Sequence, residues 1–365
     1  MNIADYVETQ LERYENVKFN MVDSLVLSQF VYLNFNGIVP ELPDCGDPVR
    51  IGDLLKAELI PQMLKDVWNP KSNRRLLIAL GMSPRFRDIR LSCYSDSISI
   101  VEEKQFAAVT YLLDDKTAYI AYRGTDFSIA GWKENFNMAF ISPVPAQQEG
   151  VSYLNMVAER FPQHALMIGG HSKGGNVAVY SAMECNPQVQ ERIIGVYSHD
   201  GPGFKDEIFT SEKYARIKER IHKTLPQSSL IGMLLQHHED YIVVESKQFW
   251  LMQHDPFSWI VSNGDFRYKE GITGGAKHID NAINHWIASL DDKKRELFVT
   301  TIYSVIESMG VEKITDFNAD WHKKAMKAMR TLRGIDAETK RFVLETIKSL
   351  IALYMKSFKF PIKVK

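Results

Sequence analysis

Several features that would place a protein in a special class are scarce in this sequence. Its 365 residues include three cysteines, Cys45, Cys93 and Cys185, which are too few and too scattered to predict a disulfide framework or a zinc site. The 45 acidic and 44 basic residues nearly cancel, giving a net charge of −1, so no nucleic-acid partner is indicated. No stretch approaches the roughly 18 consecutive apolar residues of a membrane-spanning helix.

These absences also bear on location and cofactors. The first residues have neither a basic start nor a long apolar run, so we expect no signal peptide. With so few cysteines, we expect a reducing compartment and hence the cytoplasm. The composition, 45% hydrophobic and 24% charged, is typical of a soluble globular protein. The sequence calls for no metal or organic cofactor and leaves the oligomeric state open.

Residues 169–176 read GGHSKGGN and contain the pattern Gly-x-Ser-x-Gly. The apolar run at 165–168 predicts a buried strand before it, and residues 177–183 predict a helix after it. This context is typical of a nucleophile elbow, in which a strained corner presents the serine hydroxyl. Gly170 and Gly174 are expected because a Cβ would clash where the strand and helix meet. We therefore predict Ser172 to be a nucleophile; the alternative is a glycine-rich turn with a bystander serine.

A second landmark lies upstream. Residues 106–113 and 117–122, separated by a polar turn at 114–116, predict a β-hairpin that runs into an Arg-Gly-Thr-Asp loop. Acyl transfer needs two N–H donors aimed at the tetrahedral oxyanion. In the elbow architecture one donor comes from the residue after the nucleophile, here Lys173, and the other from an earlier loop. Thr125 is the predicted second donor; the alternative is a simple polar turn.

Together, the motif YRGTD at 122–126, Trp132 and the motif GHSKGGN resemble the class 3 lipase branch of the α/β-hydrolases. The later motifs DGPGF at 200–204 and QHDP at 253–256 resemble more closely a bacterial lipase-like family. The resemblance covers roughly residues 106–259. It implies an α/β-hydrolase fold, with a mostly parallel central sheet and helices on both faces, and a Ser-Asp-His triad. It supplies no substrate.

The predicted acid is Asp200. Residues 192–198 predict another buried strand, and reactive groups of open α/β sheets collect at the carboxyl ends of strands. In class 3 lipases the acid follows the next strand, here near 221–225, but the sequence PQSS at 226–229 offers no carboxylate. Asp240 therefore remains an alternative acid, and Asp200 an alternative cap of the Gly-Pro-Gly turn.

The predicted base is His254. The order serine, acid, histidine leaves seven histidines, namely His222, His237, His238, His254, His278, His285 and His322. His254 follows a strand-like run at 248–252, opens a turn at Asp255-Pro256, and, as the resemblance implies, lies shortly before an aromatic residue. His237 and His238 remain alternatives, although their acidic neighbours favour an exposed turn. His171 is expected to point away from Ser172.

The chain divides into three expected parts. Residues 1–95 form a mostly helical segment packed on the core, residues 96–278 the hydrolase core, and residues 279–365 a helical C-terminal segment. Strands are expected to begin near Ile98. The apolar run at 229–235 either lines an acyl pocket or lid, or packs in the core. The tail from 356 to 365 mixes lysine with apolar residues, and a frayed basic terminus is favoured over contact with an anionic membrane.

The sequence thus predicts a serine hydrolase that cleaves a small acyl ester or a lipid through an acyl-enzyme on Ser172. Lipase or carboxylesterase chemistry is implied by the resemblance alone. A thioesterase, an amidase or an acyltransferase would use the same groups. Because the acid is displaced from its class 3 position, a non-catalytic binding or scaffold protein on a hydrolase fold remains the alternative.

Overall fold

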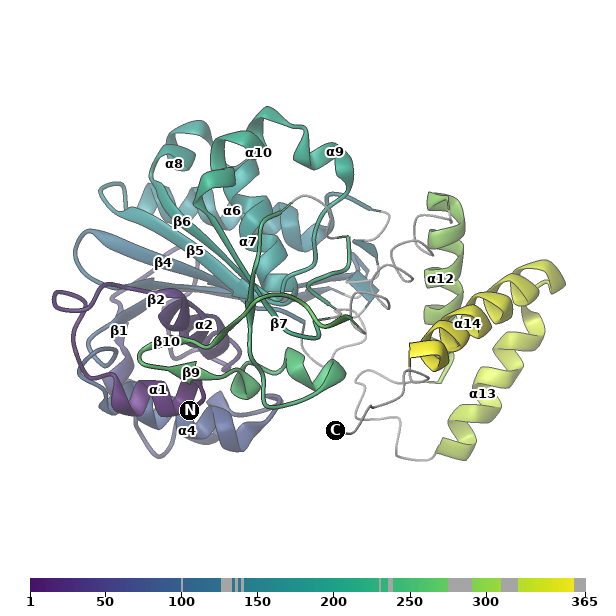
Figure 1. Ribbon diagram of the computed structural model, residues 1–365, viewed down its shortest axis with the longest axis horizontal. Coiled ribbons are helices and arrows are strands. Elements are labelled where there is room, and N and C mark those ends of the chain that lie inside the picture. The colour runs from purple at the N-terminus through teal and green to yellow at the C-terminus, as the bar shows by residue number, and fades with distance from the viewer. Residues whose placement is uncertain are drawn as a thin grey trace.

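The central sheet of this protein is mixed, with a parallel centre and antiparallel strands toward its edges (Figure 1). The computed structural model describes residues 1–99, 101–125, 133–134, 137–138, 141–229, 231–235, 239–274, 291–309 and 321–357. Over these residues a nine-stranded sheet has the order β1-β2-β3-β4-β5-β6-β7-β8-β11. The strands are β1 (Val49–Arg50), β2 (Arg90–Ser99), β3 (Lys104–Leu112), β4 (Thr117–Tyr122), β5 (Ala165–His171), β6 (Ile193–His199), β7 (Ile221–Pro226), β8 (Ile242–Val244) and β11 (Tyr268–Lys269).

Strands β4 to β8 run parallel, whereas β1 to β4 pair antiparallel and β11 returns antiparallel to β8. A separate antiparallel pair joins β9 (Val261–Ser262) and β10 (Asp265–Phe266). The central parallel strands β4 and β5 are almost entirely buried, which explains their mostly apolar sequences, whereas β7 carries His222 and Lys223.

Helices cover both faces of the sheet (Figure 1). One layer contains α1 (Ile3–Thr9), α2 (Met21–Phe30), the short α3 (Ile60–Met63) and α4 (Pro70–Met82). The other contains α6 (Pro145–Arg160), α7 (Lys173–Glu184), α8 (Pro187–Glu191), α9 (Asp206–Phe209) and α10 (Glu212–Ile217). Two hydrophobic clusters fill the spaces between the sheet and these layers. The predicted architecture, a mostly parallel sheet with helices on both faces, is confirmed.

The local predictions around the sheet are largely confirmed. Strands β3 and β4 form the expected hairpin, β5 leads into α7, and the strands predicted near 192–198 and 221–225 are β6 and β7. The expected start of the strands near Ile98 is wrong, because β1 and most of β2 precede it. The N-terminal segment thus supplies strands as well as helices, and β2 spans the expected boundary at 95/96. The proposed division of the chain stays a prediction.

The strand expected at 248–252 is also wrong. The chain forms a 3-10 helix there, η3 (Trp250–His254), followed by η4 (Pro256–Ser258). The side chain of Gln253 explains this local structure, because its amide donates to Gln248 O at 2.8 Å and accepts from Ser228 N at 2.9 Å. The Gln253 side chain here satisfies backbone N–H and C=O groups that would otherwise need a partner on a neighbouring strand.

Two of the three cysteines form a disulfide, Cys45–Cys93, which the sequence analysis did not predict. The two cysteines are 48 residues apart in the sequence, so no local pattern indicates that they pair. The loop before Cys45 pairs with β2, since Tyr94 N donates to Pro40 O at 2.8 Å and Leu42 N donates to Tyr94 O at 3.1 Å. Because Cys45 and Cys93 form a disulfide, the small number of cysteines no longer argues for a reducing compartment. Cys185 is a free thiol, and its burial raises its pKa to about 12.

Three C-terminal helices lie beside the core in Figure 1: α12 (Asp292–Ser308), α13 (Trp321–Gly334) and α14 (Ala337–Ser357). They enclose an apolar cavity of about 270 Å³ whose lining includes Val343 and Ile347 of α14. Gly334 is the last residue of α13. Residues 275–290, 310–320 and 358–365, the last of these in the tail, lie outside the described residues.

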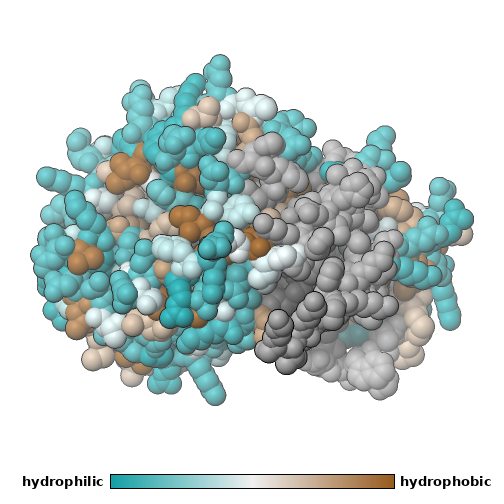
Figure 2. Space-filling view, in the orientation of Figure 1, coloured by the Kyte–Doolittle hydropathy of each residue, from teal (hydrophilic) through white to brown (hydrophobic). Residues whose placement is uncertain are grey.

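The outer surface is polar where Figure 2 shows it. Hydrophilic side chains dominate the described part of this face, and hydrophobic ones form only small, separate patches. Within the described ranges, none of the helices combines the length and hydropathy needed to traverse a bilayer.

Candidate active site

Ser172 occupies a strained corner between β5 and α7. Its φ of 59° and ψ of −131° lie outside the regions that non-glycine residues ordinarily adopt. Ser172 N donates to His199 O at 2.9 Å, and Ser172 O accepts from Gly175 N at 2.9 Å. The surrounding hydrogen bonds therefore hold the residue in this conformation. The strand, strained serine and helix have the arrangement of a nucleophile elbow.

Two glycines beside Ser172 are required by close packing. A Cβ on Gly170 would lie 2.3 Å from the carbonyl carbon of Gly174, and a Cβ on Gly174 would lie 2.1 Å from Tyr122 O. Both distances are far below van der Waals contact with rigid backbone. The reason that the sequence analysis gave for these glycines is confirmed.

The carboxylate of Asp200 lies against the ring of His254. Asp200 directly follows β6 with a φ of 52°, and its Oδ2 is 2.6 Å from His254 Nδ1. Asp200 is 1% exposed, whereas the His254 side chain is 29% exposed. A carboxylate accepts, so Nδ1 donates, and in the corresponding neutral tautomer Nε2 is an acceptor.

The second oxygen of Asp200 is held from the loop after β7. Asp200 Oδ1 accepts from Ser229 Oγ at 2.5 Å and from Gly232 N at 3.2 Å. The resemblance places an acid just after this strand; here a serine occupies that place and donates to the carboxylate on the neighbouring strand. Ser229 and Gly232 thus hold Asp200 in place, a role that the apolar sequence of this segment did not predict.

The other candidates for acid and base lie elsewhere. Asp240 is exposed, and it is Asp200 that contacts His254. His222 stacks on Tyr197 with ring centroids 5.1 Å apart. His237, His238, His278 and His285 lie outside the described residues.

His171 contacts the backbone of His254. Its Nε2 donates to His254 O at 2.8 Å, and the two rings lie with centroids 4.5 Å apart. Burial, and secondarily the neighbouring His254 and His199, lower the pKa of His171 well below its usual value. A neutral ring is consistent with this donor role. Sequence reasoning missed the contact, because nothing local to His171 indicates a partner 83 residues away.

The Arg-Gly-Thr loop passes directly against the elbow. A Cβ on Gly124 would lie 2.5 Å from His171 O and 3.1 Å from Ser172 Cβ. Arg123 anchors the loop through two hydrogen bonds to Asp96, at 3.0 and 2.9 Å. Thr125 Oγ1 is buried and has no hydrogen-bond partner within the part of the chain that the structure describes.

Lys173 is the first residue of α7. The first N–H groups of a helix have no partner within the helix and carry a partial positive charge. The predicted donor Lys173 thus directly follows Ser172, and Gly124, the neighbour of the predicted donor Thr125, packs closely against Ser172. Asp126 and Trp132 of the predicted motif lie outside the described residues.

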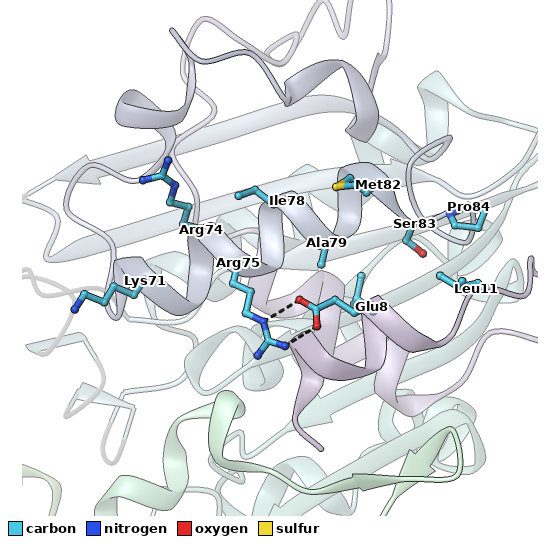
Figure 3. A pocket seen from close by; sticks show the side chains of 11 residues that line it. Glu8, Leu11, Lys71, Arg74, Arg75, Ile78, Ala79, Met82, Ser83 and Pro84 are labelled. Atoms are coloured by element: carbon cyan, nitrogen blue, oxygen red, sulfur yellow. Dashed lines mark hydrogen bonds and ion pairs between the residues drawn. The ribbon is translucent and has the colours of Figure 1, made fainter.

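A groove of about 560 Å³ lies away from these residues (Figure 3). It runs between α1 and α4, and Arg75 closes part of it through an ion pair with Glu8 at 2.5 Å. Ser172, Asp200 and His254 are not among its lining residues. The groove therefore takes no part in the site at the sheet edge.

Residues 80–304 match the family model described as Mbeg1-like. The chain belongs to the Mbeg1-like family. The matched segment includes Thr125, Ser172, Asp200 and His254. The fold of this Mbeg1-like chain is the α/β-hydrolase fold, as predicted. The bacterial part of the resemblance stays a prediction.

Solved structures that are similar to this Mbeg1-like chain include fungal lipases. The native lipase–propeptide complex of Rhizomucor miehei is 18% identical, with a TM-score of 0.34; the alignment covers 51% of this chain and 64% of the lipase, just under two thirds. A fungal lipase–inhibitor complex is 14% identical over 67% of this chain and 84% of the lipase, with a TM-score of 0.38. A variant of MDLA from Penicillium cyclopium is 12% identical over 68% and 83%, with a TM-score of 0.38. A search of curated proteins gives no match.

Proposed function

We propose that this protein is a serine hydrolase that cleaves an ester, of the lipase or carboxylesterase type. The observation that carries the proposal is the 2.6 Å contact between Asp200 and His254 at the sheet edge that also presents Ser172. An acid that holds the histidine in one tautomer, with the other nitrogen free to accept a proton, is what nucleophilic activation of a serine requires.

In the proposed mechanism, His254 Nε2 accepts the proton of Ser172 Oγ as the oxygen attacks the acyl carbonyl. The backbone N–H groups of Lys173 and Thr125 stabilise the oxyanion, and Asp200 stabilises the imidazolium. His254 then protonates the leaving alcohol, and an acyl-enzyme forms on Ser172. A water activated by His254 releases the acid by the reverse steps.

The buried hydroxyl of Thr125 supports its place in the oxyanion hole. A buried hydroxyl without a partner costs stability, and Thr125 Oγ1 is such a group among the described residues. A developing oxyanion would give it an acceptor. We propose that the threonine donates twice, through its N–H and its hydroxyl.

The proposed substrate is a small acyl ester or a lipid. The solved structures similar to this chain are described as lipases, but no residue of the chain specifies acyl length or leaving group. Thioester, amide or acyl-transfer chemistry would use the same groups. The alternative of an inactive scaffold depended on the displaced position of the acid, and the contact between Asp200 and His254 favours the hydrolase. A cytoplasmic location stays a prediction.

The test is covalent labelling by a fluorophosphonate, followed by intact mass. We expect one adduct on the native chain, none on Ser172→Ala, and one on Ser152→Ala, a control that removes an exposed serine. A series of p-nitrophenyl esters of increasing acyl length would then define the substrate. A folded native chain that takes no label would overturn the proposal in favour of a binding role.

A further inference from the structure

The residue after the proposed nucleophile is a buried lysine. The Lys173 side chain is 1% exposed, and its Nζ donates to Gln105 O at 2.5 Å, Gln105 Oε1 at 2.9 Å and Glu134 Oε2 at 2.7 Å. An ammonium group has three protons, and these three acceptors engage all of them. The ammonium therefore does not offer a proton to a substrate, and its role depends on what it holds in place.

Glu134 completes a junction of several segments. Its Oε2 also accepts from Gln105 N at 3.1 Å, and its Oε1 accepts from Ala146 N at 2.8 Å in the first turn of α6. The start of β3, the start of α6 and the elbow thus meet at one fully buried ion pair. Burying two charges is a poor way to gain stability, so such pairs are better explained by the geometry they impose.

The junction leads to the second proposed oxyanion donor. Because Gln105 Oε1 accepts from Lys173, the amide NH₂ must point the other way, and Gln105 Nε2 lies 3.5 Å from Gly124 O. Gly124 O and Thr125 N belong to one planar trans peptide, so they point in opposite directions. A group that holds Gly124 O on one side therefore directs the Thr125 N–H to the other.

We propose that the Lys173 side chain is a positioning residue that orients the Gly124–Thr125 peptide through Gln105. The inference rests on the proposed function. Lys173 then serves the oxyanion hole twice, with its own N–H and by setting the direction of the other donor. Loss of one oxyanion-hole donor lowers kcat by about 10²–10³, so loss of its alignment should lower kcat by roughly 10- to 10³-fold with little change in KM.

Two variants test this proposed relay, in which Lys173 orients the Gly124–Thr125 peptide through Gln105. Lys173→Met combined with Glu134→Gln removes both charges while keeping similar volumes, so that no unpaired charge stays buried. Gln105→Glu keeps an acceptor for Lys173 but replaces the donor beside Gly124 O by a second acceptor. We expect both variants to lose kcat by 10-fold or more on a p-nitrophenyl ester at nearly native KM.

A matched control is the pair Lys223–Glu239, with an N···O distance of 2.5 Å and side chains 1% and 3% exposed. Lys223→Met combined with Glu239→Gln should lower thermal stability but leave kcat within about twofold, since neither residue contacts the elbow or the Arg-Gly-Thr loop in the described interactions. If the Lys173 double variant fails to fold, Gln105→Glu decides alone. A native enzyme that hydrolyses the ester, with kcat unchanged in Gln105→Glu, would overturn the relay and leave the hydrolase intact. A native chain without activity would overturn both.

Discussion

The neighbouring parallel strands β5 and β6 have the same local structure at their C-terminal ends, but the last residues of the two strands make different contacts. Strand β5 ends in His171 followed by Ser172, and β6 ends in His199 followed by Asp200. The two histidines are register partners, and the residues after them have φ values of 59° and 52°. At both strand ends the backbone turns through a left-handed conformation and places a candidate catalytic side chain at the sheet edge.

The histidines before these residues differ in what they contact. His171 donates to the backbone of His254, so it supports the proposed base. His199 lies between Ser24 Oγ at 2.9 Å and Thr224 Oγ1 at 2.7 Å, so it ties β6 to α2 and β7. Burial, and secondarily His222, lowers the pKa of His199 to about 3. The same local geometry thus anchors a site loop in one case and the protein core in the other.

The largest effect is expected at Asp200, which holds the proposed base. Asp200→Asn should lower kcat by about 10⁴, because the amide can no longer stabilise the imidazolium or select the tautomer. Ester hydrolysis measures it, with circular dichroism to check folding. Asp240→Asn is the control and should retain native kcat; equal losses in both variants would remove Asp200 from the mechanism.

The next largest effect is expected for His171→Phe, which tests the role of the histidine at the end of β5. The variant keeps an aromatic ring beside His254 but loses the donor to His254 O. A shift of the histidine backbone should lower kcat by about 10- to 100-fold, with a smaller effect on the melting temperature than on activity. Native kcat in a folded His171→Phe protein would show that the contact is only packing.

The same change at the end of β6, His199→Phe, should lower stability more than activity. It removes a bonding partner of the buried Ser24 and Thr224 hydroxyls, at a cost of about 1–3 kcal/mol in the free energy of unfolding. Urea unfolding measures this cost, and kcat should stay within about threefold of native. A large activity loss with native stability would break the proposed division between the histidines.

The last expected effect is on acid sensitivity. Between its unfolded pKa near 6.5 and its folded pKa of about 3, His199 binds a proton only in the unfolded chain. The free energy of unfolding should therefore fall as the pH drops through this window, by up to about 1.4 kcal/mol per pH unit for this group. His171 acts in the same direction. Unfolding at pH 7, 5.5 and 4.5 should show a shallower slope in His199→Phe; parallel slopes would contradict the buried neutral ring.

Features encoded within a few residues were determined by the sequence itself. The elbow, its glycines and the β3–β4 hairpin follow from short patterns, because steric fit and hydrophobic periodicity act over neighbouring residues. The position of Asp200 at a strand end also follows from such a pattern. These patterns predicted the candidate serine and acid, whereas the resemblance to class 3 lipases implied the fold class and a Ser-Asp-His triad.

The tertiary structure decided what joins these segments. The contact between Asp200 and His254 spans 54 residues, the disulfide spans 48, and the Lys173–Glu134 pair spans 39. The 3-10 helix that carries His254 depends on Gln253 and Ser228 rather than on its own apolar run. Such contacts depend on how the strands and loops are brought together in three dimensions, and no local pattern of charge, size or hydropathy specifies which distant group will lie opposite.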